Sequence, residues 1–356
     1  MKVMFKSMAG AATVLMLVAA ALLGPGAAVA RKSDVYDHFK RCPTGAPEMN
    51  DPAKRGVVCV SNTVREGSFK VGNLQAAIDS PTNIQFAFTV TEGAEEGDPQ
   101  TIALVPGSTS LEGAPIVLPN PFYTPPAAPG AAAAPPAAAK KKAKKKHRKK
   151  CKKHQRKCKR AKHKKHKKKP KKPAVPAPVP TVPPVATDPF IKIAVQTAGD
   201  IRNFDIQSIF GESGSLYEMP VKLQVTGEGL GPNCFIGSDA KPILLGPVPI
   251  SPFSSFQIGS DPNGLNVELL SLGGADTEDA TFTAPGAHGC GTVVDPAAGT
   301  GSLDTPINSL IGLPATAGAS KVVFGNLLIE MAAAIIDGTP PDGGAALKEA
   351  FEAATH

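Results

Sequence analysis

The chain of 356 residues is 42% hydrophobic, which is enough for a substantial core. Its 35 Gly and 36 Pro exclude a protein made of long helices and favour short strands joined by turns. The net charge of +9 is unevenly spread, because residues 140–172 hold 23 Lys and Arg and no acid, while the rest holds 16 bases and 30 acids. The sequence therefore predicts an acidic body that carries a strongly basic segment.

Residues 1–30 have the composition of a secretory signal peptide. Two lysines near the start precede the apolar stretch MAGAATVLMLVAAALLG, and AVA at 28–30 matches a small-residue cleavage site. We therefore expect a secreted protein that begins at Arg31. The alternative is a retained membrane anchor, because residues 7–30 form an uncharged run of 24 residues. The helix-breaking GPG at 24–26 favours cleavage.

Residues 31–118 are expected to form a first β-rich segment. Its strand candidates are short apolar runs rich in β-branched and aromatic residues. They are VVCV at 57–60, IQFAFTV at 84–90, TIALV at 101–105 and PIVL at 115–118. The acidic run EGAEEGDP at 92–99 lacks the spacing of a calcium loop and predicts a solvated loop.

Residues 119–187 are expected to be a disordered insertion. Two Pro-rich arms, 119–139 and 173–187, flank the basic tract 140–172, and such arms favour an extended polyproline conformation. The tract holds 20 Lys, 3 Arg and 4 His in KKKAKKKHRKKCKKHQRKCKRAKHKKHKKKPKK. Its His and Cys side chains are too far apart along a helix to hold one tetrahedral ion, so we expect no metal site there.

The basic tract predicts attachment to polyanions. A run of like charge meeting phosphate releases counterions and binds without reading base sequence, and the tract has no aromatic residue for base stacking. The expected partners are anionic envelope polymers or lipid headgroups, with sequence-blind nucleic-acid binding and self-association through the acidic body as further options. The alternative is a spacer that binds nothing. The representative polyanion-binding residues are Lys140, Lys144, Arg148, Lys152, Arg156, Arg160, Lys164 and Lys168.

Residues 188–356 are expected to form a second β-rich segment, which either shares a core with 31–118 or folds separately. Period-two alternation predicts strands in FIKIAVQT at 190–197, PVKLQVT at 220–226 and LNVELL at 265–270. SLGGAD at 271–276 is a turn signal, and ADTEDA at 275–280 predicts a solvated loop.

Two stretches near the end of the chain carry helical signals. KVVFGNLLIEMAAAIID at 321–337 is ambiguous, because its first half suits a strand and its second half a helix. GGAALKEAFEAAT at 343–355 predicts a short terminal helix with Leu347 and Phe351 four residues apart on one face. Short strands and short turns together predict a mainly β fold, either an antiparallel β-sandwich or an open barrel.

Six cysteines in an exported chain predict disulfides. They allow 15 complete pairings, among which sequence alone does not choose. The simplest pairing is local and joins Cys42 to Cys59 and Cys234 to Cys290. The thiol state of Cys151 and Cys158, which lie in the tract, stays open.

Three stretches resemble a group of uncharacterised secreted proteins of high-GC Gram-positive bacteria. They are YDHFKRCPTGAPEM near the expected mature start, YEMPVKLQVTGEGLGPNCFIGSDAKPILL and TFTAPGAHGCG. The most specific elements are NCFIGS at 233–238 and GCG at 289–291. The resemblance implies a secreted β-rich protein with a Cys234–Cys290 bridge, and it implies no activity.

The body offers few catalytic groups, so we expect no enzyme, no catalytic residue and no cofactor. Its His residues are His38, His288 and His356, and it lacks the HExxH metal motif and a phosphate-binding loop. His288 in APGAHGCG is expected to be a turn residue, and a disulfide at Cys290 would remove the neighbouring thiol. The absence of Trp disfavours a sugar-binding surface. If the tract is only a spacer, the alternative is a β-rich body that acts as a ligand-binding or hydrolytic module.

Overall fold

The computed structural model describes residues 36–91, 100–120, 123, 188–209, 214–261, 264–295 and 299–354. The expected signal peptide at 1–30, the acidic run at 92–99 and the basic tract at 140–172 lie outside these residues. Of the insertion expected to be disordered at 119–187, the structure describes Pro119, Asn120 and Tyr123, and the rest also lies outside the described residues. The fold therefore concerns the acidic body on both sides of the insertion.

The larger of two main sheets, sheet A, contains ten strands. Its central order is β12-β14-β18-β1-β4-β5, with β13, β2, β3 and β6 paired beside that path. The strands are β1 (Gly56–Val64), β2 (Glu66–Val71), β3 (Leu74–Ile78), β4 (Thr82–Thr91), β5 (Thr101–Leu104), β6 (Ser110–Glu112), β12 (Val248–Pro249), β13 (Ser255–Ser260), β14 (Val267–Asp279) and β18 (Lys321–Ile335).

The smaller main sheet, sheet B, contains six strands in the order β15-β10-β9-β8-β7, with β11 paired to β9. They are β7 (Ile116–Pro119), β8 (Phe190–Thr197), β9 (Met219–Gly227), β10 (Phe235–Ile236), β11 (Ile243–Leu245) and β15 (Ala287–His288). A separate hairpin joins β16 (Thr292–Asp295) to β17 (Gly299–Ser302). The helices are α2 (Ile206–Ile209), α3 (Asp304–Ile311), α4 (Gly343–Ala354) and the 3₁₀ turns η2 (Asp37–Phe39) and η3 (Pro47–Asn50).

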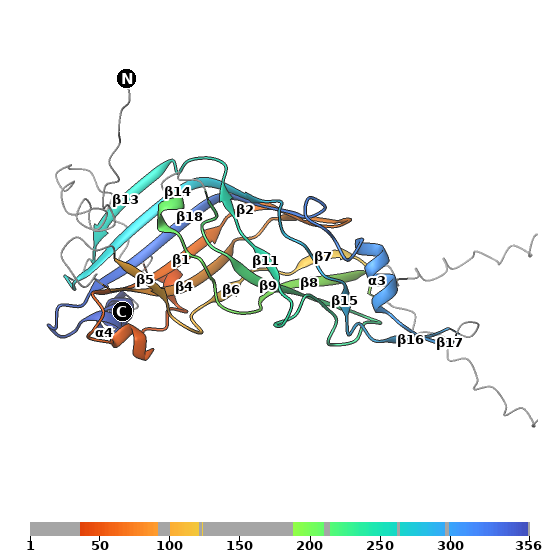
Figure 1. Ribbon diagram of the computed structural model, residues 1–356, viewed down its shortest axis with the longest axis horizontal. Helices are drawn as coiled ribbons and strands as arrows, with labels where there is room; N and C mark the ends of the chain where they lie inside the picture. Colours follow the sequence, from red (N-terminus) through yellow and green to blue (C-terminus); the bar gives the residue numbers. More distant parts are fainter. Residues whose placement is uncertain are drawn as a thin grey trace, which may run out of the picture.

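The two main sheets form an elongated sandwich whose strands run along the long axis of the molecule (Figure 1). All strand pairs within sheets A and B are antiparallel, and neither sheet closes into a barrel. The predicted mainly β fold with antiparallel sheets is therefore confirmed. The terminal helix α4 lies at one end of the sandwich, and α3 lies at the other (Figure 1).

The main core lies between the sheets. Sheet A contributes Val60 and Phe86, and sheet B contributes Ile193 and Leu223, all of which belong to one buried cluster. The alternation in β8 and β9 places their apolar residues on this inner face, as period two requires. The strands predicted at 190–197 and 220–226 are thus confirmed.

A second core covers the opposite, outer face of sheet A. β1 is buried on both faces, because Val57 and Cys59 point away from the main core toward η2, η3 and α4. Leu347 of α4 is fully buried in this second cluster, and the ring of Phe351 stacks on Phe39 with 5.5 Å between the ring centres. The predicted terminal helix is confirmed, and its apolar side covers the sheet.

The stretch 321–337, whose sequence is ambiguous between strand and helix, forms a strand in both halves. β18 runs as one strand of 15 residues and pairs with β1 on one side and β14 on the other. Two neighbouring strands satisfy its backbone groups, and this overrides the helical preference of its Ala-rich end. The fully buried Ala332 and the nearly buried Ala334 lie in the second core, where small side chains allow α4 to pack closely.

The turn predicted at 271–276 and the solvated loop predicted at 275–280 are wrong. Residues 271–279 belong to β14, a strand of 13 residues, and the register shifts between Gly273 and Thr277 mark a bulge that bends it. The carboxylate of Asp279 is buried and accepts a hydrogen bond of 2.7 Å from the backbone N–H of Gly246. Asp276 likewise accepts a hydrogen bond from the backbone N–H of Asn326, while Glu278 forms an ion pair with Lys321.

The segments before and after the insertion share one sheet. β1, from the first segment, pairs with β18 of the second over eight residue pairs, and β14 continues the sheet beyond β18. β7 and β8, which flank the insertion, pair with each other in sheet B. The main core likewise draws residues from both segments.

Candidate functional site

The insertion begins and ends at one place, which we call the insertion root and define as Pro119, Asn120, Asp188, Pro189 and Phe190. Pro119 of β7 is paired with Phe190 of β8, so the two strands form an antiparallel hairpin. The backbone N–H of Asn120 donates a 2.7 Å hydrogen bond to the carbonyl of Pro189. The insertion therefore replaces the turn of a hairpin, and its two ends are held side by side.

Polar side chains tie the insertion root to the neighbouring strand β9. Asn120 is 6% exposed, and its amide donates to the carbonyls of Asp188 at 3.0 Å and Glu228 at 3.4 Å. The carboxylate of Glu228 accepts a 2.7 Å hydrogen bond from the N–H of Asp188. These bonds fix the hairpin end to the residue that follows β9. The root lies at the α3 end of the sandwich (Figure 1).

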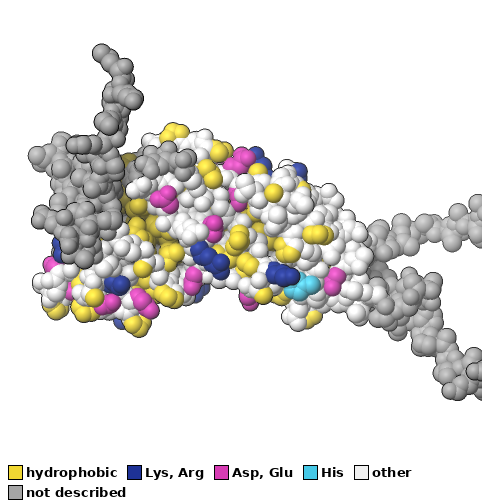
Figure 2. All heavy atoms as spheres, viewed as in Figure 1, with side chains coloured by type: hydrophobic (Ala, Val, Ile, Leu, Met, Phe, Trp, Pro, Cys, Tyr) yellow, Lys and Arg dark blue, Asp and Glu magenta, His cyan; other side chains and the backbone are white. Residues whose placement is uncertain are grey.

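All eight representative polyanion-binding residues, from Lys140 to Lys168, lie outside the described residues, so the structure does not test that assignment. On the face of the body drawn in Figure 2, Lys and Arg side chains are scattered among Asp and Glu and do not gather into a basic patch. The densest positive charge of the chain is therefore the tract itself, where 23 bases occur without an acid.

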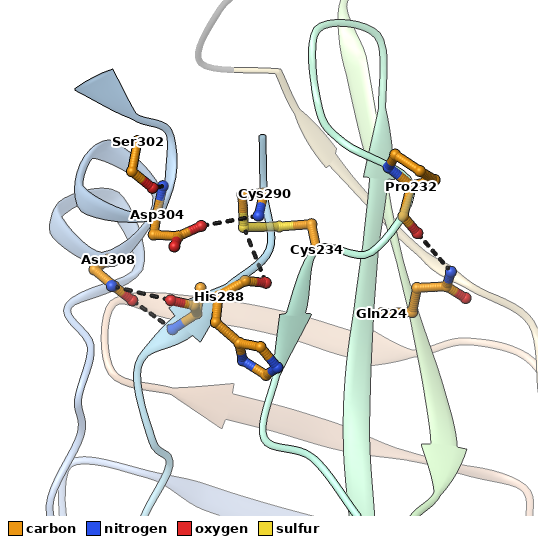
Figure 3. Close-up of a disulfide and its surroundings, with 9 residues drawn as sticks. Gln224, Pro232, Cys234, His288, Cys290, Ser302, Asp304 and Asn308 are labelled. Atoms are coloured by element: carbon orange, nitrogen blue, oxygen red, sulfur yellow. Dashed lines mark hydrogen bonds between the residues drawn. A yellow bond between two sulfur atoms is a disulfide. The ribbon is translucent and has the colours of Figure 1, made fainter. Parts of the chain in front are cut away.

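The disulfide Cys234–Cys290 lies near the same end of the sandwich and joins the residue before β10 to the second residue after β15 (Figure 3). The N–H of Cys290 donates a 2.8 Å hydrogen bond to Asp304 of α3, and Asn308 of α3 accepts a 2.6 Å hydrogen bond from the N–H of Ala287. Gly289 has φ of +69°, and a Cβ there would collide with the carbonyl of Asn233. Glycine in the GCG stretch is thus required by this close approach.

The structure contains both local disulfides, Cys42–Cys59 and Cys234–Cys290. Cys151 and Cys158 lie outside the described residues. The first bridge ties the segment with η2 to β1, and the second ties sheet B to the α3 region. Neither bridge crosses the insertion, so each half of the body carries its own.

The prediction that His288 is a turn residue is wrong, because it belongs to the short strand β15. Its ring lies beside that of Phe235, with 6.4 Å between the ring centres. The side chains of the nearby Asp304 and Asn308 accept hydrogen bonds from the backbone N–H groups of Cys290 and Ala287 (Figure 3). Among the described residues, no group of three His, Cys, Asp or Glu is placed to hold a metal ion.

One polar arrangement escaped the sequence analysis. Glu330 of β18 lies on the outer face of sheet A, next to Ser61 of β1 in the strand register. Its Oε2 atom is buried without a hydrogen-bond partner and lies 3.8 Å from Nε2 of His38. Burial raises the pKa of Glu330, and the charges of His38 and Arg65 oppose that shift. The packing of η2 on the outer face of sheet A brings His38 to Glu330 of β18, so no local pattern indicates the pair.

Comparison with protein-family models, curated proteins and solved structures gave no match for this chain. The resemblance to secreted proteins of high-GC Gram-positive bacteria therefore stays a prediction. No helix within the described residues is long and apolar enough to cross a membrane.

Proposed function

We propose that the chain is a secreted, non-enzymatic protein that is held at phosphate-bearing polymers or lipid headgroups of the cell envelope by its basic insertion. The observation that carries the proposal is the segregation of charge. Residues 140–172 hold 23 bases and no acid, whereas the rest of the chain holds 16 bases and 30 acids. The body by itself is repelled by polyanions, so attachment depends on the tract.

The geometry of the insertion root supports a protein in which the tract binds polyanions and the body stays folded. The root joins the tract to the body through one hairpin, and its ends are fixed by backbone pairing and by Asn120. A segment joined at one point of a sheet leaves the core unchanged when it binds elsewhere. Two disulfides in the body agree with export to an oxidising compartment.

The test compares three forms of the chain from residue 31. In the first variant, an Asn-Gly turn replaces residues 121–187. In the second, Gln replaces every Lys and Arg in 140–172, so the length of the insertion is kept while its charge is lost. Cosedimentation is measured with phosphatidylglycerol vesicles, phosphatidylcholine vesicles and teichoic acid, and DNA binding is measured by filter retention.

The intact chain should bind the anionic probes at 50 mM salt and lose roughly 10³-fold in affinity by 200 mM, as expected for many phosphate contacts. Both variants should fail to bind, and phosphatidylcholine should bind none of the three forms. Retention of the Gln variant at the affinity of the intact chain would contradict the proposal. That outcome favours the alternative, in which the tract is a spacer and the body is a ligand-binding or hydrolytic module.

A further inference from the structure

The sandwich contains an apolar cavity that the proposed attachment does not use. Its volume is about 400 Å³, and it lies where β3, the outermost strand of the hairpin beside β18, faces β7, the edge of sheet B. Both sheets line it. Sheet A contributes Phe69, Ala76 and Phe324, and sheet B contributes Ile116 and Met219.

The inner wall is built from a cross-strand row. Ala76 of β3 is paired with Phe69 of β2, and Phe69 is paired with Val322 of β18, so all three side chains share one face of the sheet. Phe69 is 4% exposed and Val322 is 1% exposed. On the other side, Met219 of β9 is 1% exposed. The wall therefore consists of side chains that the fold holds in place.

The cavity opens at the edge of the sandwich, because Asp79, Ser80 and Val117 of its lining are exposed, while its inner wall is buried. Pockets that bind small ligands have volumes of roughly 300 to 1,000 Å³, mostly apolar walls and a few polar groups. The cavity has both the size and the lining of a ligand site.

The polar groups of the lining identify the class of ligand. The polar residues of the lining are Gln75 of β3, Asp79 and Ser80 of the turn after it, and Thr82 at the start of β4, and the lining contains no Lys, Arg or His. Asp79 is the one residue of the lining with a formal charge. An anionic group in this cavity meets a carboxylate and no cation, which disfavours fatty acids and phosphates inside it.

The cavity also lies close to the insertion root. Ile116, Val117 and Leu118 line it, and the same strand, β7, ends at Pro119 of the root. An anionic surface that is bound by the basic insertion would therefore lie near β7, the strand that forms one wall of the cavity. An anionic lipid surface combines the phosphate groups that attract Lys and Arg with uncharged hydrocarbon chains.

From these observations we propose that the cavity binds an uncharged hydrocarbon chain, such as the acyl chain of an envelope lipid. Binding buries apolar surface of the chain against Phe69, Phe324 and Met219, and the hydroxyl groups of Ser80 and Thr82 in the lining are available to the polar end. The insertion is not required for this binding, so the site is separable from the attachment proposed above.

The experiment titrates the neutral fluorophore N-phenyl-1-naphthylamine into the chain from residue 31. Ala76→Phe fills the cavity from β3. Ala114→Phe blocks it from the loop before β7, at an exposed position that tolerates a larger side chain. Ala103→Phe, an equally large change at an exposed position of β5 outside the cavity, is the matched control. Circular dichroism checks that each variant is folded.

The intact chain and the Ala103→Phe control should each bind one fluorophore. Of the cavity variants Ala76→Phe and Ala114→Phe, at least one that is folded should bind the fluorophore at least tenfold more weakly than the intact chain does. Dodecanol should displace the fluorophore at least tenfold better than dodecanoate, and Asp79→Asn should reduce that difference. The variant with residues 121–187 replaced by a turn should bind as the intact chain does. Absence of saturable binding, or binding as tight as that of the intact chain by folded Ala76→Phe and folded Ala114→Phe, would overturn the cavity proposal without affecting the attachment proposal.

Discussion

At the scale of single residues, several buried polar side chains take their hydrogen bonds and pKa values from partners that are distant in the sequence. Tyr36 donates a 2.7 Å hydrogen bond to the buried carboxylate of Asp261, which lies 225 residues away in the sequence. Burial, together with this carboxylate, raises the pKa of the Tyr36 phenol. The hydroxyl of Tyr217 accepts a 2.7 Å hydrogen bond from the amide of Asn62 inside the main core. Hydrogen bonds of this kind join residues that come before the insertion to residues that come after it.

Glu330 provides a prediction about pH. Because burial raises the pKa of Glu330, the folded state holds its proton more tightly than the unfolded chain does. Its contribution to stability is therefore complete below the unfolded pKa and is lost as the pH rises through the folded pKa. We expect Glu330→Gln to leave stability unchanged near pH 4 and to raise it by about 1 kcal/mol at pH 7, as for removal of a buried carboxylate charge whose Oε2 atom lacks a hydrogen-bond partner.

Urea unfolding at the two pH values measures the effect of Glu330→Gln. Glu349→Gln, on the exposed side of α4, is the matched control and should change stability little at either pH. His38 and Arg65 are the charged groups whose attraction opposes the effect. A Glu330→Gln protein less stable than its parent at pH 7 would show that this attraction outweighs burial.

At the scale of elements, the two disulfides close loops of different length. Cys234 and Cys290 are 56 residues apart in the sequence, and Cys42 and Cys59 are 17 apart. The longer loop includes β11, β12, β13 and β14, which span both sheets. The bridge at Cys234 and Cys290 therefore restricts a larger part of the unfolded chain.

Replacing both Cys234 and Cys290 by Ser should lower the free energy of unfolding by roughly 4 kcal/mol on the chain-entropy model. The matched change at Cys42 and Cys59 should cost roughly 3 kcal/mol, because its loop is shorter. Equilibrium unfolding in urea under oxidising conditions measures both. A larger loss for the Cys42–Cys59 pair would mean that its packing in the second core matters more than loop length.

At the scale of the whole molecule, the body is one structure assembled from two stretches of chain. β1 and β4 come from before the insertion and β14 and β18 from after it, yet they are neighbours in sheet A. The insertion joins two strands that are already paired in sheet B. Continuity of the chain through the insertion is therefore not needed to hold the assembled body together.

This arrangement predicts the result of cutting the chain. A site-specific protease sequence placed in 124–139, with Cys151 and Cys158 changed to Ser, allows one cut that no disulfide spans. The two fragments should elute together from a size-exclusion column in native buffer and separate in 6 M urea. The uncut protein in the same buffers is the control. Separation of the fragments without denaturant would show that sheet pairing alone does not hold them.

The local pattern of residues was sufficient for several features of the fold. Period-two alternation predicted β8 and β9, because each has one face in the main core and the other toward solvent. The spacing of Leu347 and Phe351 predicted α4 for the same reason. The sequence by itself also determined the separation of charge between residues 140–172 and the body, since that is a property of composition.

Only the tertiary structure decided the features that depend on distant partners. β18 is a strand throughout because β1 and β14 flank it, although its Ala-rich end favours a helix in isolation. β14 continues through stretches with turn and loop composition because β18 pairs with it across a bulge. The environment of Glu330 and the apolar cavity likewise arise where separate strands meet. Local propensities amount to tenths of a kcal/mol per residue, so strand pairing and burial outweigh them.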